Sequence, residues 1–96
     1  MVDILLLGMN HRNAPVELRE RLAFSPEQYR RAINDLREPF DGREIVILST
    51  CNRTELYIHS DDLCQDEGIV KKYLAQKSQL PVETLEKQLF RKSGID

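Results

Sequence analysis

The longest apolar runs of the chain are two short stretches, each ended by glycine or by a polar residue. Residues 4–7 are all isoleucine or leucine and precede Gly8, and residues 45–48 are all isoleucine, valine or leucine and precede Ser49. Runs of this kind are typical of strands that are covered on both faces. Residues 54–59 alternate instead, as in a strand with one face in water. The pattern therefore predicts two buried strands and one half-exposed strand.

A helix is predicted between the two buried strands, over residues 26–38. Ser25 can cap its first turn, Pro26 suits the first helical position, and Gln28 completes a capping box with the serine. A proline and an Asp-Gly pair then end the helix. Its inward face is expected to comprise Tyr29, Ala32, Ile33, Leu36 and Phe40. A shorter helix is expected just before it, over residues 17–23.

A further helix is expected after the alternating strand, beginning at Asp61 or Asp66. Its apolar stripe comprises Ile69, Val70, Tyr73 and Leu74, and its lysines, Lys71, Lys72 and Lys77, are expected to face water. A last helical segment follows Pro81, with Val82, Leu85 and Leu89 turned inward. Residues 89–92 are expected to form a final strand.

This order of elements predicts an α+β fold. Strands and helices in the order βαββαβ are expected to form a two-layer ferredoxin-like sandwich, with an antiparallel sheet and its helices on one face. The first two strands run the same way, joined by a right-handed crossover, and the third strand lies between them.

Composition narrows the class of protein. Ninety-six residues with 41% hydrophobic content and a net charge of -2 fit one folded, soluble domain. No apolar stretch is long enough for a membrane span, and the N-terminus lacks the features of a signal peptide, so a cytoplasmic protein is expected. The acidic balance gives no broad nucleic-acid footprint. Cys51 and Cys64 form no CxxC pair, so we expect free thiols and no metal site.

Two polar segments that are distant in sequence are expected to share one edge of the sheet. Asn10, His11 and Arg12 follow the first strand, and residues 50–53 follow the second. Because these strands are parallel and separated by one strand, the two segments should lie about 10 Å apart. Long side chains can cover that gap, so the sequence predicts a single site here.

The chemistry available at this edge centres on Cys51. A nucleophilic cysteine needs its thiolate, which nearby cations and backbone N–H groups stabilise. Arg12, Arg53 and Arg19 are candidate cations, and His11 is a candidate proton acceptor. A pair of arginines could also hold a substrate carboxylate through bidentate hydrogen bonds.

Structural roles for the same residues remain open at this point. Cys51 could be a small residue packed at a strand end, and His11 could make only local hydrogen bonds. Arg12 and Arg53 could be solvated surface charges. Cys64 has no basic neighbours in sequence and is expected to be incidental.

Two motifs carry a resemblance to a known family. Residues 8–24, GMNHRNAPVELRERLAF, and residues 48–57, LSTCNRTELY, closely resemble the N-terminal catalytic domain of glutamyl-tRNA reductase. Their order and spacing also match, and the resemblance covers essentially the whole chain. One departure is Asn13, which stands where a threonine is usual.

The resemblance implies a reaction and roles for the candidate residues. The Cys51 thiolate would attack the ester that joins glutamate to its tRNA, and NADPH would reduce the resulting thioester to glutamate-1-semialdehyde for tetrapyrrole (porphyrin) synthesis. Thr50, Asn52 and Arg53 would contact the glutamyl group, with Arg53 a candidate for its carboxylate. Asn10, His11 and Arg12 would shape the same pocket.

The resemblance also implies parts that these residues do not contain. Reductases of the family continue into an NADPH-binding domain and a helical dimerisation domain, and no GxGxxG occurs in the 96 residues. Residues 1–96 are therefore expected to be an incomplete N-terminal catalytic domain that cannot finish the reduction alone. The full-length enzyme is expected to be a homodimer that passes its product to an aminomutase, with no membrane partner.

The alternative is a non-catalytic ferredoxin-like module whose same loops bind a ligand or partner. An RNA-recognition motif is disfavoured, since the central strands lack its aromatic pattern.

Overall fold

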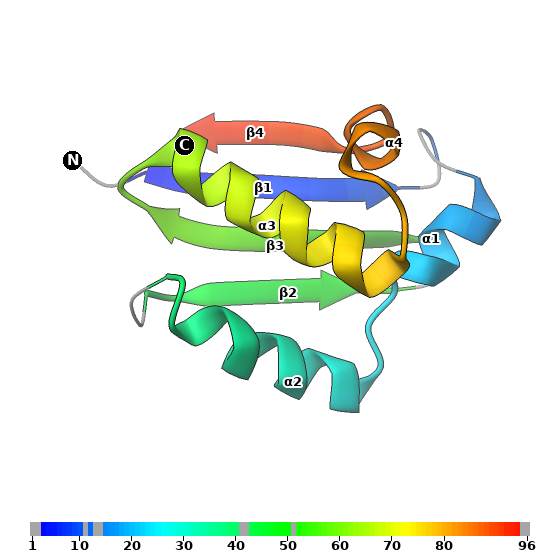
Figure 1. Ribbon diagram of the computed structural model, residues 1–96, viewed down its shortest axis with the longest axis horizontal. Helices are drawn as coiled ribbons and strands as arrows, with labels where there is room; N and C mark the ends of the chain where they lie inside the picture. The colour runs from blue at the N-terminus through cyan, green and yellow to red at the C-terminus, as the bar shows by residue number, and fades with distance from the viewer. Residues whose placement is uncertain (1–2, 11, 13–14, 41–42, 51, 95–96) are drawn as a thin grey trace.

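The computed structural model describes residues 3–10, 12, 15–40, 43–50 and 52–94. The elements follow one another as β1 (Asp3–Asn10), α1 (Val16–Leu22), α2 (Pro26–Arg37), β2 (Ile45–Ser49), β3 (Arg53–Ser60), α3 (Leu63–Ser78), α4 (Val82–Glu86) and β4 (Phe90–Gly94) (Figure 1). The predicted order of strands and helices is confirmed, with boundaries shifted by one or two residues.

The four strands form one sheet in the order β2-β3-β1-β4. All three pairs of neighbours are antiparallel, so β1 and β2 run the same way with β3 between them, as predicted. Figure 1 shows α3 crossing in front of β1 and β3, and α2 lying along the β2 side. The α+β sandwich with helices on one face of the sheet is confirmed.

The core lies between the sheet and the helices. Alternate residues of β1 and β3 are buried there, and Val70 and Leu74 of α3 cover them. The strand residues of this core are Leu5, Leu7, Met9, Ile47, Leu56 and Ile58. On the opposite face, Ile4 is 47% exposed and Val46 is 54% exposed. The prediction that both apolar strands are covered on both faces is therefore wrong for the described residues, because their helices all pack on one side.

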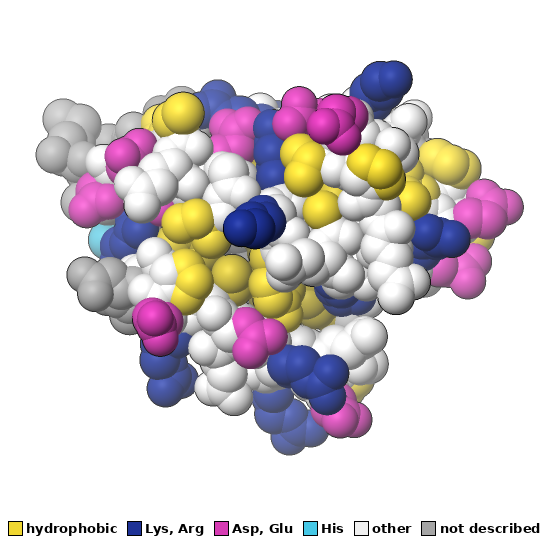
Figure 2. Space-filling model, in the orientation of Figure 1, with side chains coloured by type: hydrophobic (Ala, Val, Ile, Leu, Met, Phe, Trp, Pro, Cys, Tyr) yellow, Lys and Arg dark blue, Asp and Glu magenta, His cyan; other side chains and the backbone are white. Residues whose placement is uncertain are grey.

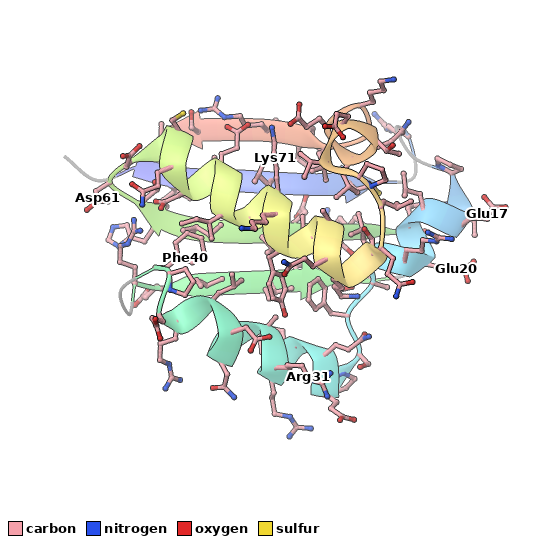
Figure 3. The ribbon with its side chains drawn as sticks, in the orientation of Figure 1. Glu17, Glu20, Arg31, Phe40, Asp61 and Lys71 are labelled. Carbon is pink, nitrogen blue, oxygen red and sulfur yellow. The ribbon has the colours of Figure 1, made fainter. Side chains whose placement is uncertain are left out.

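Helix α2 begins with the predicted capping box. The Ser25 hydroxyl accepts from the Gln28 backbone N–H, and the Gln28 side chain accepts from the Ser25 N–H. Phe40 points inward between the end of α2 and the sheet (Figure 3), and is fully buried. Tyr29 was predicted in the core but is 39% exposed. Because α2 lies along one side of the sheet, only its narrow stripe through Ala32 and Leu36 is buried.

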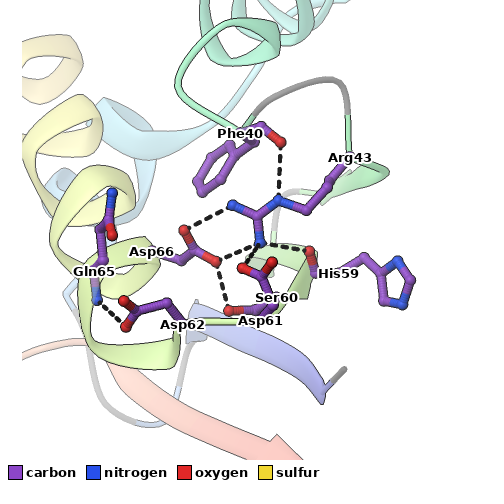
Figure 4. A network of polar contacts seen from close by, with 8 residues as sticks. All are labelled: Phe40, Arg43, His59, Ser60, Asp61, Asp62, Gln65 and Asp66. Atoms are coloured by element: carbon purple, nitrogen blue, oxygen red, sulfur yellow. Dashed lines mark hydrogen bonds and ion pairs between the residues drawn. The ribbon is translucent and has the colours of Figure 1, made fainter. Parts of the chain in front are cut away.

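Helix α3 begins at neither predicted aspartate. Its N-cap is Asp62, whose side chain accepts from the Gln65 N–H. Asp66 is instead buried inside the first turn, where it binds Arg43 (Figure 4).

The lysines of α3 differ from one another in their surroundings. Lys72 is exposed, as predicted. Lys71 is only 19% exposed, because it pairs with Glu67. Lys77 is half-buried and donates to the backbone oxygen of Ala23 at 2.8 Å, so its predicted exposure is wrong.

Candidate active site

Three strand ends meet at one edge of the sheet. Asn10 at the end of β1 pairs with Arg53 at the start of β3, and Ser49 at the end of β2 pairs with Thr54. The structure thus places Asn10 of the first polar segment directly beside Arg53 of the second. The described parts are closer than expected, because Arg53 already belongs to the central strand and lies directly beside β1. His11 and Cys51 lie outside the described residues, so their predicted placement stays a prediction.

The turn between β2 and β3 is held by Thr50. Its Oγ1 accepts from the backbone N–H groups of Asn52 and Arg53, each at 3.2 Å, and its own N–H donates to the Arg53 oxygen at 2.8 Å. The first two contacts engage two of the amides that could otherwise face a thiolate. The hydroxyl of Thr50 can still donate its own proton to a ligand, since it is exposed.

The base of this turn is fixed to the helical layer. The Ser49 hydroxyl accepts from the Phe24 backbone N–H at 2.9 Å and lies 3.2 Å from the hydroxyl of Thr54. Phe24 sits between α1 and α2, and the Lys77 ammonium lies 4.6 Å from the centre of its ring. Burial lowers the pKa of Lys77. The turn is therefore anchored through the α1–α2 junction to the end of α3.

Arg53 has two neighbours on its own face of β3 that the sequence did not single out. Its Nε lies 3.8 Å from Oε1 of Glu55, and the Tyr57 hydroxyl donates to that same oxygen at 2.8 Å. Glu55 is only 8% exposed, whereas the Arg53 side chain is 51% exposed. The hydrogen bond to Glu55, together with burial and the charge of that carboxylate, raises the pKa of Tyr57. A glutamate in mid-strand, two residues from an arginine, was the available signal.

The remaining candidates occupy varied settings. Asn52 and Arg12 are exposed, and Arg19 is half-buried on α1. Cys64 is exposed in the first turn of α3, in line with the expected free thiol. Among the described residues, no group of three or more histidine, cysteine or acidic side chains could hold a metal ion.

The helix-covered side of the molecule shows no large patch of a single charge. Acidic and basic side chains are interspersed across it (Figure 2). Glu17 and Glu20 on α1 and Arg31 on α2 all project outward (Figure 3). None of the described helices is long and apolar enough to cross a membrane.

Comparison with known proteins decides the family. Residues 7–96 match the family described as the N-terminal domain of glutamyl-tRNA(Glu) reductase. The chain belongs to this family. The match includes both polar segments that meet at the sheet edge, so the edge described above is that of a glutamyl-tRNA reductase N-terminal domain.

Several curated relatives are glutamyl-tRNA reductases. The protein from Marinobacter nauticus is 48% identical over 87 residues, which are 91% of this chain and 20% of that protein. The one from Pelobacter propionicus is 40% identical over 93% of this chain and 20% of its own length. The one from Alcanivorax borkumensis is 44% identical over 97% of this chain and 22% of its own length. The chain thus spans about a fifth of the length of the reductases it matches.

The described residues do not fit a nicotinamide dinucleotide. Such cofactors bind at a glycine-rich turn between a strand and a helix, at the switch point of a parallel sheet. Here all neighbouring strands are antiparallel and the sequence has no GxGxxG.

Proposed function

We propose that this domain is the acyl-accepting part of a glutamyl-tRNA reductase. The Cys51 thiolate attacks the carbonyl carbon of the ester that joins glutamate to the 3' end of tRNA. A carbon–sulfur bond forms, the carbon–oxygen bond to the ribose breaks, and the ribose oxygen leaves with a proton. The product is a glutamyl thioester, which accepts hydride more readily than a carboxylate does.

The pairing of Asn10 with Arg53 is the observation that supports this proposal most directly. It joins the family's two motifs at the edge where the turn around position 51 leaves the sheet. The candidate substrate residues of the two segments are Asn10, His11, Arg12, Thr50, Asn52 and Arg53.

Arg53 is the candidate for the substrate carboxylate. Its Nε lies 3.8 Å from Glu55, and about half of the side chain remains exposed. A guanidinium in this setting can still offer two parallel N–H groups to a carboxylate in a charge-assisted, bidentate contact.

The rest of the reaction is assigned to polypeptide outside these 96 residues. NADPH supplies the hydride in this proposal, bound by another domain. We further propose that the whole enzyme is a cytoplasmic homodimer of the tetrapyrrole (porphyrin) route, with glutamyl-tRNA as substrate and an aminomutase as the consumer of its product.

The first test is direct detection of the acyl enzyme. Incubation of the 96-residue chain with glutamyl-tRNA is expected to add one glutamyl group, and mass spectrometry of peptides is expected to place it at Cys51. Cys64→Ser serves as the matched control, since it removes an exposed thiol without touching the turn. An adduct that survives Cys51→Ser, or that appears only at Cys64, would refute the assignment of the nucleophile.

A thiol titration separates catalysis from mere ligand binding. If Cys51 is the nucleophile, the rate of its alkylation in the Cys64→Ser variant should follow a pKa well below the ordinary value of about 8.5. An unreactive thiol would favour the non-catalytic binding module instead.

A further inference from the structure

We call the face of the sheet opposite the helices the open face. Its centre is apolar and comprises Ile4, Leu6, Val46, Leu48, Tyr57 and Phe90. The strand register places Val46, Tyr57 and Leu6 in one row across β2, β3 and β1. Two shallow hollows of about 250 and 340 Å³ adjoin this row, and Ile4 and Tyr57 line both. The largest exposed apolar side chains of the sheet are thus gathered on one surface.

The next row of the open face is already closely packed. Phe90 on β4 lies over Gly8, so that a Cβ atom added there would come within 2.7 Å of the phenylalanine ring. Glu55 occupies the same row and is buried. The polar groups around the apolar centre, namely Glu44, His59 and Lys92, line the same hollows at their margins. An apolar centre with a polar rim is the usual composition of a protein interface.

The sequence of β1 and β2 conflicts with the exposure of this face. An antiparallel sheet with one wet face alternates apolar and polar residues, but residues 4–7 and 45–48 are apolar without interruption. Only half of these positions contribute to the core beneath the helices, with Leu5, Leu7 and Ile47 buried and Ile45 partly buried. The other half include Ile4 and Val46, the most exposed apolar residues of the sheet. Both strands therefore carry apolar residues for a second covering layer that the described residues do not supply.

We propose that the open face is the docking surface for an apolar element of the same polypeptide, contributed by the part of a reductase outside residues 1–96. The curated relatives are about five times as long as the matched segment, so such an element is available in each of them. Covalent linkage gives it a high effective concentration, unlike a separate partner. This inference rests on the proposed function only in placing the domain within a longer reductase, and it is independent of the Cys51 chemistry.

Thiol labelling tests the proposal directly. Val46→Cys would be compared with Val16→Cys, in a background carrying Cys51→Ser and Cys64→Ser. Val16 is a matched control, because it is 53% exposed on α1 and Val46 is 54% exposed. Each variant would be prepared as the 96-residue chain and as a chimera in which residues 1–96 replace the matching segment of the Marinobacter nauticus relative.

In the chimera, the thiol at position 46 is expected to react at least about tenfold more slowly than in the 96-residue chain, since a covered site reacts only on local opening. The thiol at position 16 should react equally in both. Equal reactivity of position 46 in both proteins would overturn the proposal. Protection of position 46 in the 96-residue chain that disappears on dilution would assign the face to a second copy, and would also overturn it.

A second substitution tests the same proposal without thiol labelling, in case the labelling rates of the chimera are ambiguous. Val46→Lys is expected to lower the melting temperature of the chimera by about 5 °C or more relative to its effect on the 96-residue chain. Val16→Lys should lower both equally, and a similar pattern for Val46→Lys would contradict coverage. Because the labelling background lacks Cys51, failure to form a thioester and failure of docking are separate outcomes.

Discussion

Arg53 owes its setting to two side chains on the same face of β3. Glu55 is buried beside Gly8 and Phe90, and the Tyr57 hydroxyl holds one of its oxygens at 2.8 Å. The carboxylate that lies 3.8 Å from the Arg53 Nε is therefore positioned by the strand and by the tyrosine. In the proposed site, Glu55 would act on a substrate through Arg53, as a positioning residue.

Glu55→Gln should lower the pKa of Tyr57 toward its ordinary value of about 10. The hydrogen bond to the carboxylate and its negative charge both favour the protonated phenol, and glutamine removes the charge. NMR titration of labelled tyrosine would measure the change. Tyr73, whose pKa is raised by burial and by Asp35, is an internal control that should not move. An unchanged pKa of Tyr57 would contradict the hydrogen bond between Tyr57 and Glu55.

Arg53→Gln should slow the formation of the Cys51 thioester by about 10- to 100-fold, the cost of losing a charge-assisted hydrogen bond. The glutamyl group would still reach the thiol but would lack its carboxylate anchor. The measurement is the rate of adduct formation with glutamyl-tRNA. Arg30→Gln, an exposed arginine on α2, is the control. Equal rates in both variants would remove Arg53 from substrate binding.

At the scale of elements, local signals sufficed where neighbours in sequence make the contacts. Helix α2 was predicted nearly residue by residue, because its capping box joins Ser25 and Gln28. The start of α3 was not, because Asp66 is bound by Arg43, which lies 23 positions earlier. Lys77 was misplaced for the same reason, since its partner is a backbone oxygen of the α1–α2 junction. Periodicity identifies a face of a helix and not the distant groups that meet it.

Two glycines should respond oppositely to the same substitution. Gly68 lies on the exposed side of α3 with open space at its Cβ position, so Gly68→Ala should raise the free energy of unfolding by about 0.5–1 kcal/mol. Gly8→Ala should lower it by about 1–3 kcal/mol, because the new carbon would meet Phe90 at 2.7 Å and Glu55 at 3.1 Å. Urea denaturation measures both, and changes of the same sign would contradict this packing.

At the scale of the whole molecule, one cluster joins the sheet to α3 at the end away from the candidate site. Arg43 binds both carboxylate oxygens of Asp66, at 2.8 and 3.0 Å, and also donates to the backbone oxygens of Phe40 and His59 (Figure 4). Ser60 donates to the same aspartate. The loop before β2, the end of β3 and the first turn of α3 thus share one buried ion pair.

Asp66→Asn should lower the free energy of unfolding at neutral pH by about 2–3 kcal/mol, because it leaves Arg43 without its buried counter-charge. Burial alone would raise the pKa of Asp66, but hydrogen bonds from Arg43 and Ser60, with the charge of Arg43, outweigh burial and lower it. The contribution is therefore complete above the ordinary aspartate pKa of about 3.9 and is lost as pH falls through the lower folded-state value.

Denaturant unfolding from neutral pH to pH 2 would measure this dependence, which should be weaker in Asp66→Asn. The matched control is Asp61→Asn, since Asp61 binds the same arginine at 3.1 Å but is 67% exposed. Its loss should cost less than about 1 kcal/mol. Equal losses for the two aspartates would show that burial of the pair contributes nothing.

The sequence predicted the location of the candidate site in the sheet but only some of its side-chain contacts. Topology placed Asn10 near residues 50–53 because parallel strands end at the same edge. The roles of Thr50 and Ser49 in holding the turn, and of Glu55 beside Arg53, depend on side-chain geometry that spacing does not specify. The apolar runs of β1 and β2 predicted a sheet covered on both faces. The described residues cover only one, and the open face is the basis of the docking proposal.

Because Arg53, Glu55 and Tyr57 lie side by side on one face of β3, the pKa of Tyr57 should also respond to an anion bound at Arg53. The positive charge of Arg53 lowers the pKa of Tyr57, opposing the effect of Glu55. A carboxylate bound to Arg53 would offset that charge, so Tyr57 should become harder to ionise when substrate is held. By reciprocity, ionisation of the Tyr57 phenol must lower the affinity of Arg53 for the anion. Free glutamate should therefore raise the pKa of Tyr57 in this chain and leave it unmoved in Arg53→Gln.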